Sequence, residues 1–215
     1  MLEMAKQLLV YVALGANLPS DLGSLRHTPA HTLPMALASL GALGLHLHAT
    51  SRFYATPCFP AGAGPDYVNA AAALTADPDL SPADILARLH QVEAAYGRTR
   101  STRWAGRSLD LDLLAIGDAV LPDAKTHRHW CDLPLADQAR LAPDQLILPH
   151  PRIADRAFVL VPLCDIAPDW HHPVTGHSVR TMRDALPASD LAAVRPLPEE
   201  ASDLAPIRRP TPLLP

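Results

Sequence analysis

The chain is poor in cysteine and aromatic residues and has no long apolar run, and each shortage excludes a class of protein. Its three cysteines are widely spaced and form no CxxC pair, which is typical of a reduced cytoplasmic protein and not of a disulfide scaffold. No apolar run reaches the roughly 18 residues of a membrane span, and residues 1–7 carry charges without a signal-peptide pattern. We therefore expect a cytoplasmic protein with no membrane segment.

The chain also lacks the strong positive charge of a general nucleic-acid-binding protein. Its formal net charge is −4 and 48% of its 215 residues are hydrophobic, so it can bury a substantial core as one domain. We expect that domain at 8–186 with a loose insertion at about 120–145, followed by a weakly ordered, proline-rich tail at 187–215. We expect a monomer that binds small molecules and no nucleic acid.

Several motifs of phosphate binding and covalent catalysis are missing as well. The sequence contains no GxxxxGK[ST], GxGxxG, GxSxG or HExxH motif. Its two HxH pairs, His46/His48 and His127/His129, have no matching cysteine or acidic partners, so zinc is not expected. Phosphate binding must then rest on arginine side chains and a metal ion, because no glycine-rich loop is available.

Arginine and aspartate are instead concentrated in the fifteen residues Arg98–Asp112. Within that segment, Asp110 and Asp112 lie on an apolar stretch, 108–116, that reads as a strand. The four arginines and one tryptophan that precede or border this strand are Arg98, Arg100, Arg103, Arg107 and Trp104.

Asp110 and Asp112 are two residues apart on this strand, so they point to the same face about 6.6 Å apart along the chain. Two such carboxylates repel by about 2–3 kcal/mol at an effective dielectric near 20, and arginines or a divalent metal would offset that repulsion. Oxygen ligands favour Mg²⁺ or Mn²⁺ over zinc, and arginines suit phosphates. The segment therefore indicates metal-assisted chemistry on a polyphosphate, although two solvated aspartates on an exposed edge strand remain the alternative interpretation.

The rest of the chain alternates between strand and helix patterns. Ser81-Pro-Ala-Asp84 has the form of a capping box with proline at the first helical position. A polar loop is expected at 20–30 and a proline- and glycine-rich loop at 55–66. We expect strands at 8–14, 45–54, 67–75 and 108–116, and helices at about 34–43 and 82–96.

Six segments of this chain resemble the 6-hydroxymethyl-7,8-dihydropterin pyrophosphokinase family, in the family's order. They are Val12–Leu18, Ser51–Pro57, Pro65–Ala70, Glu93–Arg100, Arg103–Asp112 and Leu148–Phe158. The resemblance implies an α+β, ferredoxin-like fold, which is an antiparallel sheet flanked by helices. It also implies transfer of pyrophosphate from ATP to the hydroxymethyl group of a dihydropterin, with release of AMP, in folate biosynthesis.

The same resemblance implies a role for individual residues. Asp110 and Asp112 would hold two Mg²⁺ ions. The catalytic residues would be Arg98, Arg107, Asp110 and Asp112. ATP would be bound by His90, Arg100, Arg103, Trp104, Arg107, His150 and Arg156. The pterin would be bound by Thr56, Pro57, Tyr67, Asn69, Trp104 and Phe158.

Two other functions share part of this pattern. A different Mg²⁺-dependent nucleotidyl- or phosphotransferase would share the aspartates and arginines, but Tyr67, Asn69 and Phe158 argue against another acceptor pocket. A non-enzymatic, ferredoxin-like module that binds a nucleotide or RNA is disfavoured by the acidic charge of the chain.

Overall fold

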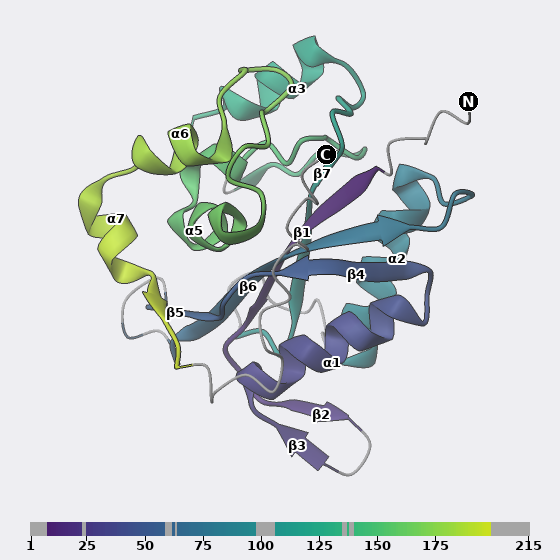
Figure 1. Ribbon diagram of the computed structural model, residues 1–215, viewed down its shortest axis with the longest axis vertical. Helices are drawn as coiled ribbons and strands as arrows, with labels where there is room; N and C mark the ends of the chain where they lie inside the picture. Colours follow the sequence, from purple (N-terminus) through teal and green to yellow (C-terminus); the bar gives the residue numbers. More distant parts are fainter. Residues whose placement is uncertain are drawn as a thin grey trace, which may run out of the picture.

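A computed structural model describes residues 8–22, 25–58, 62, 64–97, 106–134, 137 and 140–198. Figure 1 shows the arrangement of the helices and strands. In chain order they are β1 (Leu9–Ala16), β2 (Ser20–Leu22), β3 (Leu25–His27), α1 (Pro29–Gly41), β4 (Leu45–Thr50), β5 (Tyr54–Thr56), β6 (Tyr67–Ala76), α2 (Pro82–Ala95), β7 (Asp110–Ile116), α3 (Ala124–Cys131), η1 (Ile153–Asp155), α5 (Ala157–Ile166), α6 (Val179–Asp184), α7 (Ala188–Ala193) and β8 (Arg195–Pro196).

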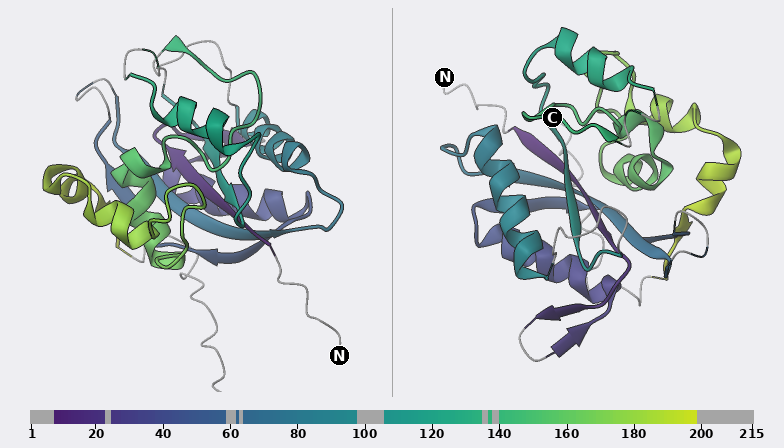
Figure 2. Two further views of the ribbon diagram at one scale, coloured as in Figure 1. Left: turned by 90° about the horizontal axis from the view of Figure 1, so that it is seen from above. Right: turned by 180° about the vertical axis from the view of Figure 1, so that it is seen from behind.

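One antiparallel sheet organises the described part of the chain. Its strands run in the order β7-β1-β6-β5-β8, and β4 also pairs with β6. Helices α1 and α2 cover one face of this sheet, and α5 and α6 lie on the other (Figures 1 and 2). The predicted strand-helix-strand-strand-helix-strand order is present in β1-α1-β4-β6-α2-β7, and the predicted ferredoxin-like, α+β fold is confirmed.

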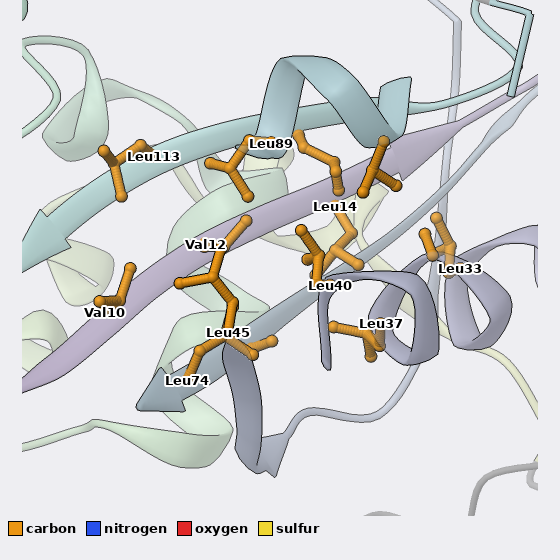
Figure 3. Packing of buried hydrophobic residues seen from close by; sticks show 14 of the residues in the cluster. Val10, Val12, Leu14, Leu33, Leu37, Leu40, Leu45, Leu74, Leu89 and Leu113 are labelled. Carbon is orange, nitrogen blue, oxygen red and sulfur yellow. The ribbon is translucent and has the colours of Figure 1, made fainter. Parts of the chain in front are cut away.

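The first face of the sheet carries the larger apolar side chains. Val10, Val12 and Leu14 alternate along β1 and are almost completely buried, as expected for a strand whose side chains point to opposite faces in turn. Figure 3 shows them against Leu40 of α1 and Leu89 of α2. Burying such a side chain stabilises the fold by about 1.5–3 kcal/mol, so this packing fixes the position of β1 and β7.

The opposite face is lined by small side chains near its centre. Ala13 of β1 and Ala71 and Ala73 of β6 pack there with Leu160 and Leu163 of α5. Alanines let a helix approach a sheet closely, and α5 makes its principal sheet contacts with β6. The amino-terminal end of α5 is therefore held over the sheet, on the same face as the carboxylates of β7.

The first helix begins earlier than the sequence patterns predicted. Thr28 is the N-cap and Pro29 occupies the first helical position, so Pro34 lies inside α1 and not in its first turn. The extended Thr28 followed by proline is itself a helix-start signal, and Pro34 offers a second, competing signal five residues later. The predicted loop at 20–30 was also wrong in part, because β2 and β3 pair as a hairpin before the helix.

Two further boundaries differ from expectation. The predicted strand 45–54 divides into β4 and β5, because extended pairing stops at Thr50 and resumes at Tyr54. The start of the predicted weak tail is ordered: Val194 packs with Tyr54 and Ala157, and the Leu197 amide donates to the Phe53 carbonyl at 2.8 Å. This ordered start of the tail contains α7 and β8. Residues 199–215 lie outside the described part.

The second helix follows its prediction closely. The Ser81 hydroxyl accepts from the Asp84 amide, and the Asp84 carboxylate accepts from the Ser81 amide at 3.0 Å, so the capping box is complete. Hydrogen bonding to Ser81 also holds the pKa of Asp84 below its usual value. Helix α2 ends just before Gly97 as expected. None of the helices in the described residues combines the length and apolar character needed to cross a membrane.

Candidate functional site

The two aspartates of β7 lie on one face of the strand, as their spacing predicted. Leu109 and Leu111 are buried on the opposite face, whereas Asp110 and Asp112 are half-buried. Between the aspartates, the Leu111 amide donates to the buried Glu93 carboxylate of α2 at 2.8 Å. The leucines and Glu93 therefore keep this end of β7 from rotating, and both carboxylates face the side covered by α5.

Each carboxylate is paired with an arginine, Asp110 with its near neighbour in sequence and Asp112 with a residue just before α5. Arg107 donates from Nη1 to Asp110 Oδ2, and Arg156 Nη1 lies 3.4 Å from Asp112 Oδ2. Burial alone would lower the pKa of the Arg107 guanidinium, but Asp110 and Asp112 outweigh that effect and raise it. The arginines thus offset the repulsion between the neighbouring carboxylates.

These carboxylates also fit a magnesium ion by their chemistry. Magnesium is commonly held by one or two carboxylates together with the phosphates of a substrate. Asp110 and Asp112 provide such an oxygen-only donor set on one strand face. The described residues contain no group of three or more histidine, cysteine, aspartate or glutamate side chains that could hold a metal ion, so at these two aspartates the remaining ligands would have to be substrate phosphates and water. Asp110 and Asp112 are therefore the candidate metal ligands.

One row of residues across β6, β1 and β7 contains both Asp110, a candidate metal ligand, and Asn69, which is expected to bind the pterin. Gly15 of β1 is the register partner of both Asn69 on β6 and Asp110 on β7. A Cβ atom added to Gly15 would lie 3.0 Å from Asn69 Oδ1 and 4.0 Å from the Cβ of Asp110. Because Gly15 has no side chain, the Asn69 oxygen can lie close to the backbone of β1, on the strand face that also carries Asp110.

Asn69 is buried and its orientation is fixed by a neighbour. Its Nδ2 donates to the Thr56 hydroxyl at 2.7 Å, across the pairing of β5 and β6. The amide oxygen of Asn69 lies over Gly15. An amide held in this way can read the donors and acceptors of a polar ring. Thr56 and Asn69 thus lie together as predicted, next to an exposed Pro57.

The two predicted aromatic residues of the pterin pocket come from β6 and α5. Tyr67 is half-buried, and burial raises the pKa of its phenol, with Arg107 opposing and Asp110 adding to the shift. Phe158, near the start of α5, is 40% exposed, and the Arg156 guanidinium lies 5.7 Å from its ring centre. Because Arg156 also contacts Asp112, the predicted pterin and ATP residues meet at Arg156 and Phe158.

A cavity of about 400 Å³ opens beside Asp112, between β7, α2 and the segment before His150. His90, Asp112 and His150 line it together, which brings two predicted ATP-binding residues to a predicted metal ligand. The end of the insertion also lines the cavity, through Pro143, Asp144 and Gln145. No role for the insertion followed from sequence patterns, because its contribution depends on how it folds back on β7.

His150 is held as a neutral imidazole. Burial lowers its pKa to about 4, with Arg156 and Arg152 acting in the same direction and Asp112 opposing them. Its Nδ1 accepts from the Arg152 amide at 3.0 Å, and its own amide donates to the Leu114 carbonyl of β7 at 2.7 Å. A neutral ring with Nδ1 occupied can donate a hydrogen bond from Nε2.

Asn17 is a site residue that the sequence patterns did not single out. Its side-chain oxygen accepts from the Arg107 amide at 2.7 Å, and its Nδ2 donates to the Pro65 carbonyl at 3.1 Å. Asn17 therefore joins the segment that carries Arg107 to the loop before β6. The only signal was its place in Val12–Leu18, a segment quoted for the resemblance.

Four predicted site residues lie outside the described part of the chain: Arg98, Arg100, Arg103 and Trp104. Their roles stay predictions. The other predicted residues form two adjoining groups on the α5 side of the sheet and beside β7. The first comprises Thr56, Pro57, Tyr67, Asn69, Arg107 and Asp110, and the second His90, Asp112, His150, Arg156 and Phe158.

Comparison with curated proteins identifies the relatives of this chain. A 2-amino-4-hydroxy-6-hydroxymethyldihydropteridine pyrophosphokinase of Synechocystis is 32% identical over 195 residues, covering 91% of this chain and 85% of that protein. The protein of the same name from Pseudomonas aeruginosa is 36% identical over 169 residues, covering 78% of this chain and 86% of that protein.

A solved structure has the same fold at much lower sequence identity. A triple mutant of Plasmodium falciparum HPPK-DHPS superposes with a TM-score of 0.57 at 14% identity, covering 85% of this chain and 45% of that longer one. The family model of 7,8-dihydro-6-hydroxymethylpterin-pyrophosphokinase (HPPK) matches residues 11–168. The chain spans most of the length of these two curated relatives. It belongs to the 7,8-dihydro-6-hydroxymethylpterin-pyrophosphokinase family.

Proposed function

We propose that this protein transfers pyrophosphate from ATP to 6-hydroxymethyl-7,8-dihydropterin, giving AMP and the pterin diphosphate in folate biosynthesis. The observation that carries the proposal is the row Asn69–Gly15–Asp110 across three paired strands. It sets an amide suited to a pterin edge beside a carboxylate suited to a metal ion. Family membership supports the same reaction.

The pterin lies, in this proposal, over Gly15. Asn69 reads the ring edge, with its amide held by Thr56, and Thr56 and Pro57 add backbone contacts. Phe158 stacks on the flat heterocycle after its contact with Arg156 is released. Tyr67 and Trp104 complete the pocket. The hydroxymethyl group then points from Asn69 towards Asp110.

The triphosphate lies between β7 and the arginines. His90, Arg100, Arg103, Trp104 and His150 bind ATP on the cavity side. Arg107 and Arg156 are each paired with an aspartate, and when ATP binds they contact its phosphates in place of part of that ion pair. An arginine fork matches phosphate oxygens well, and its release from a carboxylate frees that carboxylate to bind a cation.

Asp110 and Asp112 hold magnesium, two ions in this proposal, on one face of β7. When bound, magnesium neutralises phosphate charge and favours ionisation of the attacking hydroxyl. The pterin hydroxyl gives up its proton to water, and its oxygen forms a bond to the β-phosphorus as the bond from that phosphorus to the α-phosphate oxygen breaks, so that AMP leaves. Arg98 and Arg107 stabilise the charge that develops on the phosphates.

We further propose that a single domain of about 8–186 carries this activity, that the protein acts as a monomer, and that it works in the cytoplasm. The three cysteines, Cys58, Cys131 and Cys164, are free thiols, and burial raises the pKa of Cys131 to about 11 and that of Cys164 above its usual value. Thiols in this state suit a reducing compartment.

Product analysis tests the reaction directly. The wild-type protein is incubated with ATP and magnesium, with and without 6-hydroxymethyl-7,8-dihydropterin, and the nucleotides are separated. We expect AMP, and only when the pterin is present. Appearance of ADP would place the attack at the γ-phosphorus and point to another phosphotransferase. Binding of ATP with no turnover of any kind would favour a nucleotide-binding module.

A further inference from the structure

We infer that His127, in the insertion between β7 and the segment before His150, is a positioning residue for ATP: its ring holds the Pro149 carbonyl and thereby fixes the adjacent His150. The inference rests on the proposed function, because it assigns His150 to the ATP side of the site. It adds a residue, and a purpose for the insertion, that the comparisons do not supply.

The hydrogen bond between His127 and Pro149 has one possible direction. His127 Nε2 lies 2.9 Å from the Pro149 carbonyl oxygen, and the ring is 1% exposed. A carbonyl oxygen only accepts, so Nε2 carries the proton and donates. Nδ1 is then the acceptor in a neutral ring, and the Cys131 Sγ lies 3.6 Å from it, one helical turn later.

The neutral state of this ring agrees with its surroundings. Burial lowers the pKa of His127, and Arg128 acts in the same direction, against the raising effect of the Pro149 carbonyl. The ring therefore remains an uncharged donor near neutral pH.

The position of His127 is itself fixed from two sides. Helix α3 starts at a defined residue, because the Asp123 side chain accepts from the amides of Lys125 and Thr126 at 2.8 and 2.9 Å. The His172 ring then packs against His127 with ring centres 5.2 Å apart. His172 cannot turn freely, because its Nδ1 accepts from two backbone amides. His127 is thus a rigid support for the loop it contacts.

The supported loop forms one wall of the cavity beside Asp112. Leu121 and Leu148 exchange two backbone hydrogen bonds, of 2.9 and 3.1 Å, and the His150 amide bonds to β7. The insertion therefore holds the segment 148–150 at Leu148 and again, through His127, at Pro149. Without the second bond, His150 would occupy its ATP-binding orientation in only a fraction of the molecules. The apparent affinity for ATP would fall in proportion to that fraction.

Two substitutions separate the hydrogen bond from the packing. His127→Phe keeps a ring for contact with His172 and removes the donor, whereas His127→Gln keeps an N–H donor and removes the ring. His129→Ala removes an exposed ring from the same helix and is the control. The dissociation constant of an ATP analogue with a methylene bridge between the α- and β-phosphorus is measured with magnesium, alongside KM and kcat.

We expect His127→Phe to weaken analogue binding and raise the KM for ATP by about tenfold, with the KM for the pterin unchanged and kcat within about twofold. His127→Gln should bind within about threefold of the wild type, and His129→Ala like the wild type. If the Phe variant does not fold, His127→Ala replaces it as the donor-free variant.

The opposite pattern overturns the inference. Wild-type affinity in the donor-free variant, or equal weakening in the Phe and Gln variants, would mean that the hydrogen bond does not position ATP. A proportional loss of kcat and of both KM values would indicate a general structural role. Failure of the proposed function is distinguishable, because the wild type itself would then release no AMP or bind no analogue.

Discussion

Asp165 and Asp112 both pair with an arginine, yet their surroundings differ. Asp165, on α5, accepts from the Arg52 backbone amide, Nε and Nη2 and from the Tyr54 hydroxyl, at 2.8–3.2 Å. Asp112, on β7, receives a single hydrogen bond of 3.4 Å, from Arg156, within the described residues, and it lines a cavity.

This difference separates a carboxylate that holds the fold together from one that is available to a ligand. The bonds to Asp165 use both of its oxygens and tie β5 to α5, and they help to raise the pKa of Tyr54 and of Arg52. Asp112 retains oxygen lone pairs for a cation. We therefore expect neutralisation of Asp165 to affect mainly stability, and neutralisation of Asp112 to affect mainly activity.

The largest expected effect is the loss of activity in Asp112→Asn. The substitution keeps the shape of the side chain but removes a charge that binds magnesium, so kcat/KM should fall by about 10³-fold. Stability should change by less than about 1 kcal/mol, because the ion pair with Arg156 is partly exposed and a repulsion with Asp110 is relieved. Steady-state kinetics and urea denaturation of the same preparation measure both.

Asp165→Asn should show the reverse pattern. An amide cannot accept all the hydrogen bonds that Arg52 and Tyr54 donate to the carboxylate, and we expect about 2 kcal/mol of lost stability after allowance for the partly exposed arginine. The urea midpoint should fall at constant slope, while kcat/KM stays within about twofold. Loss of activity with unchanged stability would reverse our assignment of the two aspartates.

His172 extends the comparison to a buried structural imidazole. Burial, with the neighbouring His127 and His177 acting in the same direction, lowers its pKa to about 4. The unfolded chain, with an ordinary pKa near 6.5, then takes up the proton first, so stability is lost as pH falls from about 6.5 towards 4.

Between pH 7 and pH 5 we expect the wild type to lose about 2 kcal/mol more stability than His172→Asn. The Asn side-chain oxygen can replace Nδ1 as acceptor for the amides of Val174 and Thr175, but it does not titrate. Urea denaturation at the two pH values gives the difference. Equal losses in both proteins would show that His172 is not the titrating group.

The smallest expected effect concerns the space beside Asp110. Gly15→Ala places a Cβ 3.0 Å from Asn69 Oδ1, which forces that amide to shift by a few tenths of an ångström. We expect the KM for the pterin to rise about fivefold, a loss typical of one imperfect hydrogen bond, with the KM for ATP unchanged. Gly41→Ala, in α1 with no atom within 4 Å of the added carbon, is the matched control.

Local patterns predicted what local forces determine. The capping box at Ser81 and the alternation of Asp110 and Asp112 with leucines involve residues within a few positions of each other, and both are confirmed. The start of α1 was misplaced because two prolines, Pro29 and Pro34, offered competing signals, and propensity does not decide between them.

Long-range contacts were beyond the reach of those patterns. The register that sets Gly15 between Asn69 and Asp110 depends on pairing between residues far apart in the sequence, Gly15 with Asn69 and Gly15 with Asp110. The bond from His127 to Pro149 depends on the folding of an insertion without a recognisable motif. The family resemblance provided the predicted roles, but neither of these two contacts.

The most direct test is release of AMP from ATP and magnesium by the wild type and by Asp110→Ala, with and without 6-hydroxymethyl-7,8-dihydropterin, after circular dichroism has established that both are folded. We predict AMP only from the wild type, and only with the pterin and magnesium present. AMP release by a folded Asp110→Ala at the wild-type rate would contradict the metal site on β7 and, with it, the distinction between the two aspartates.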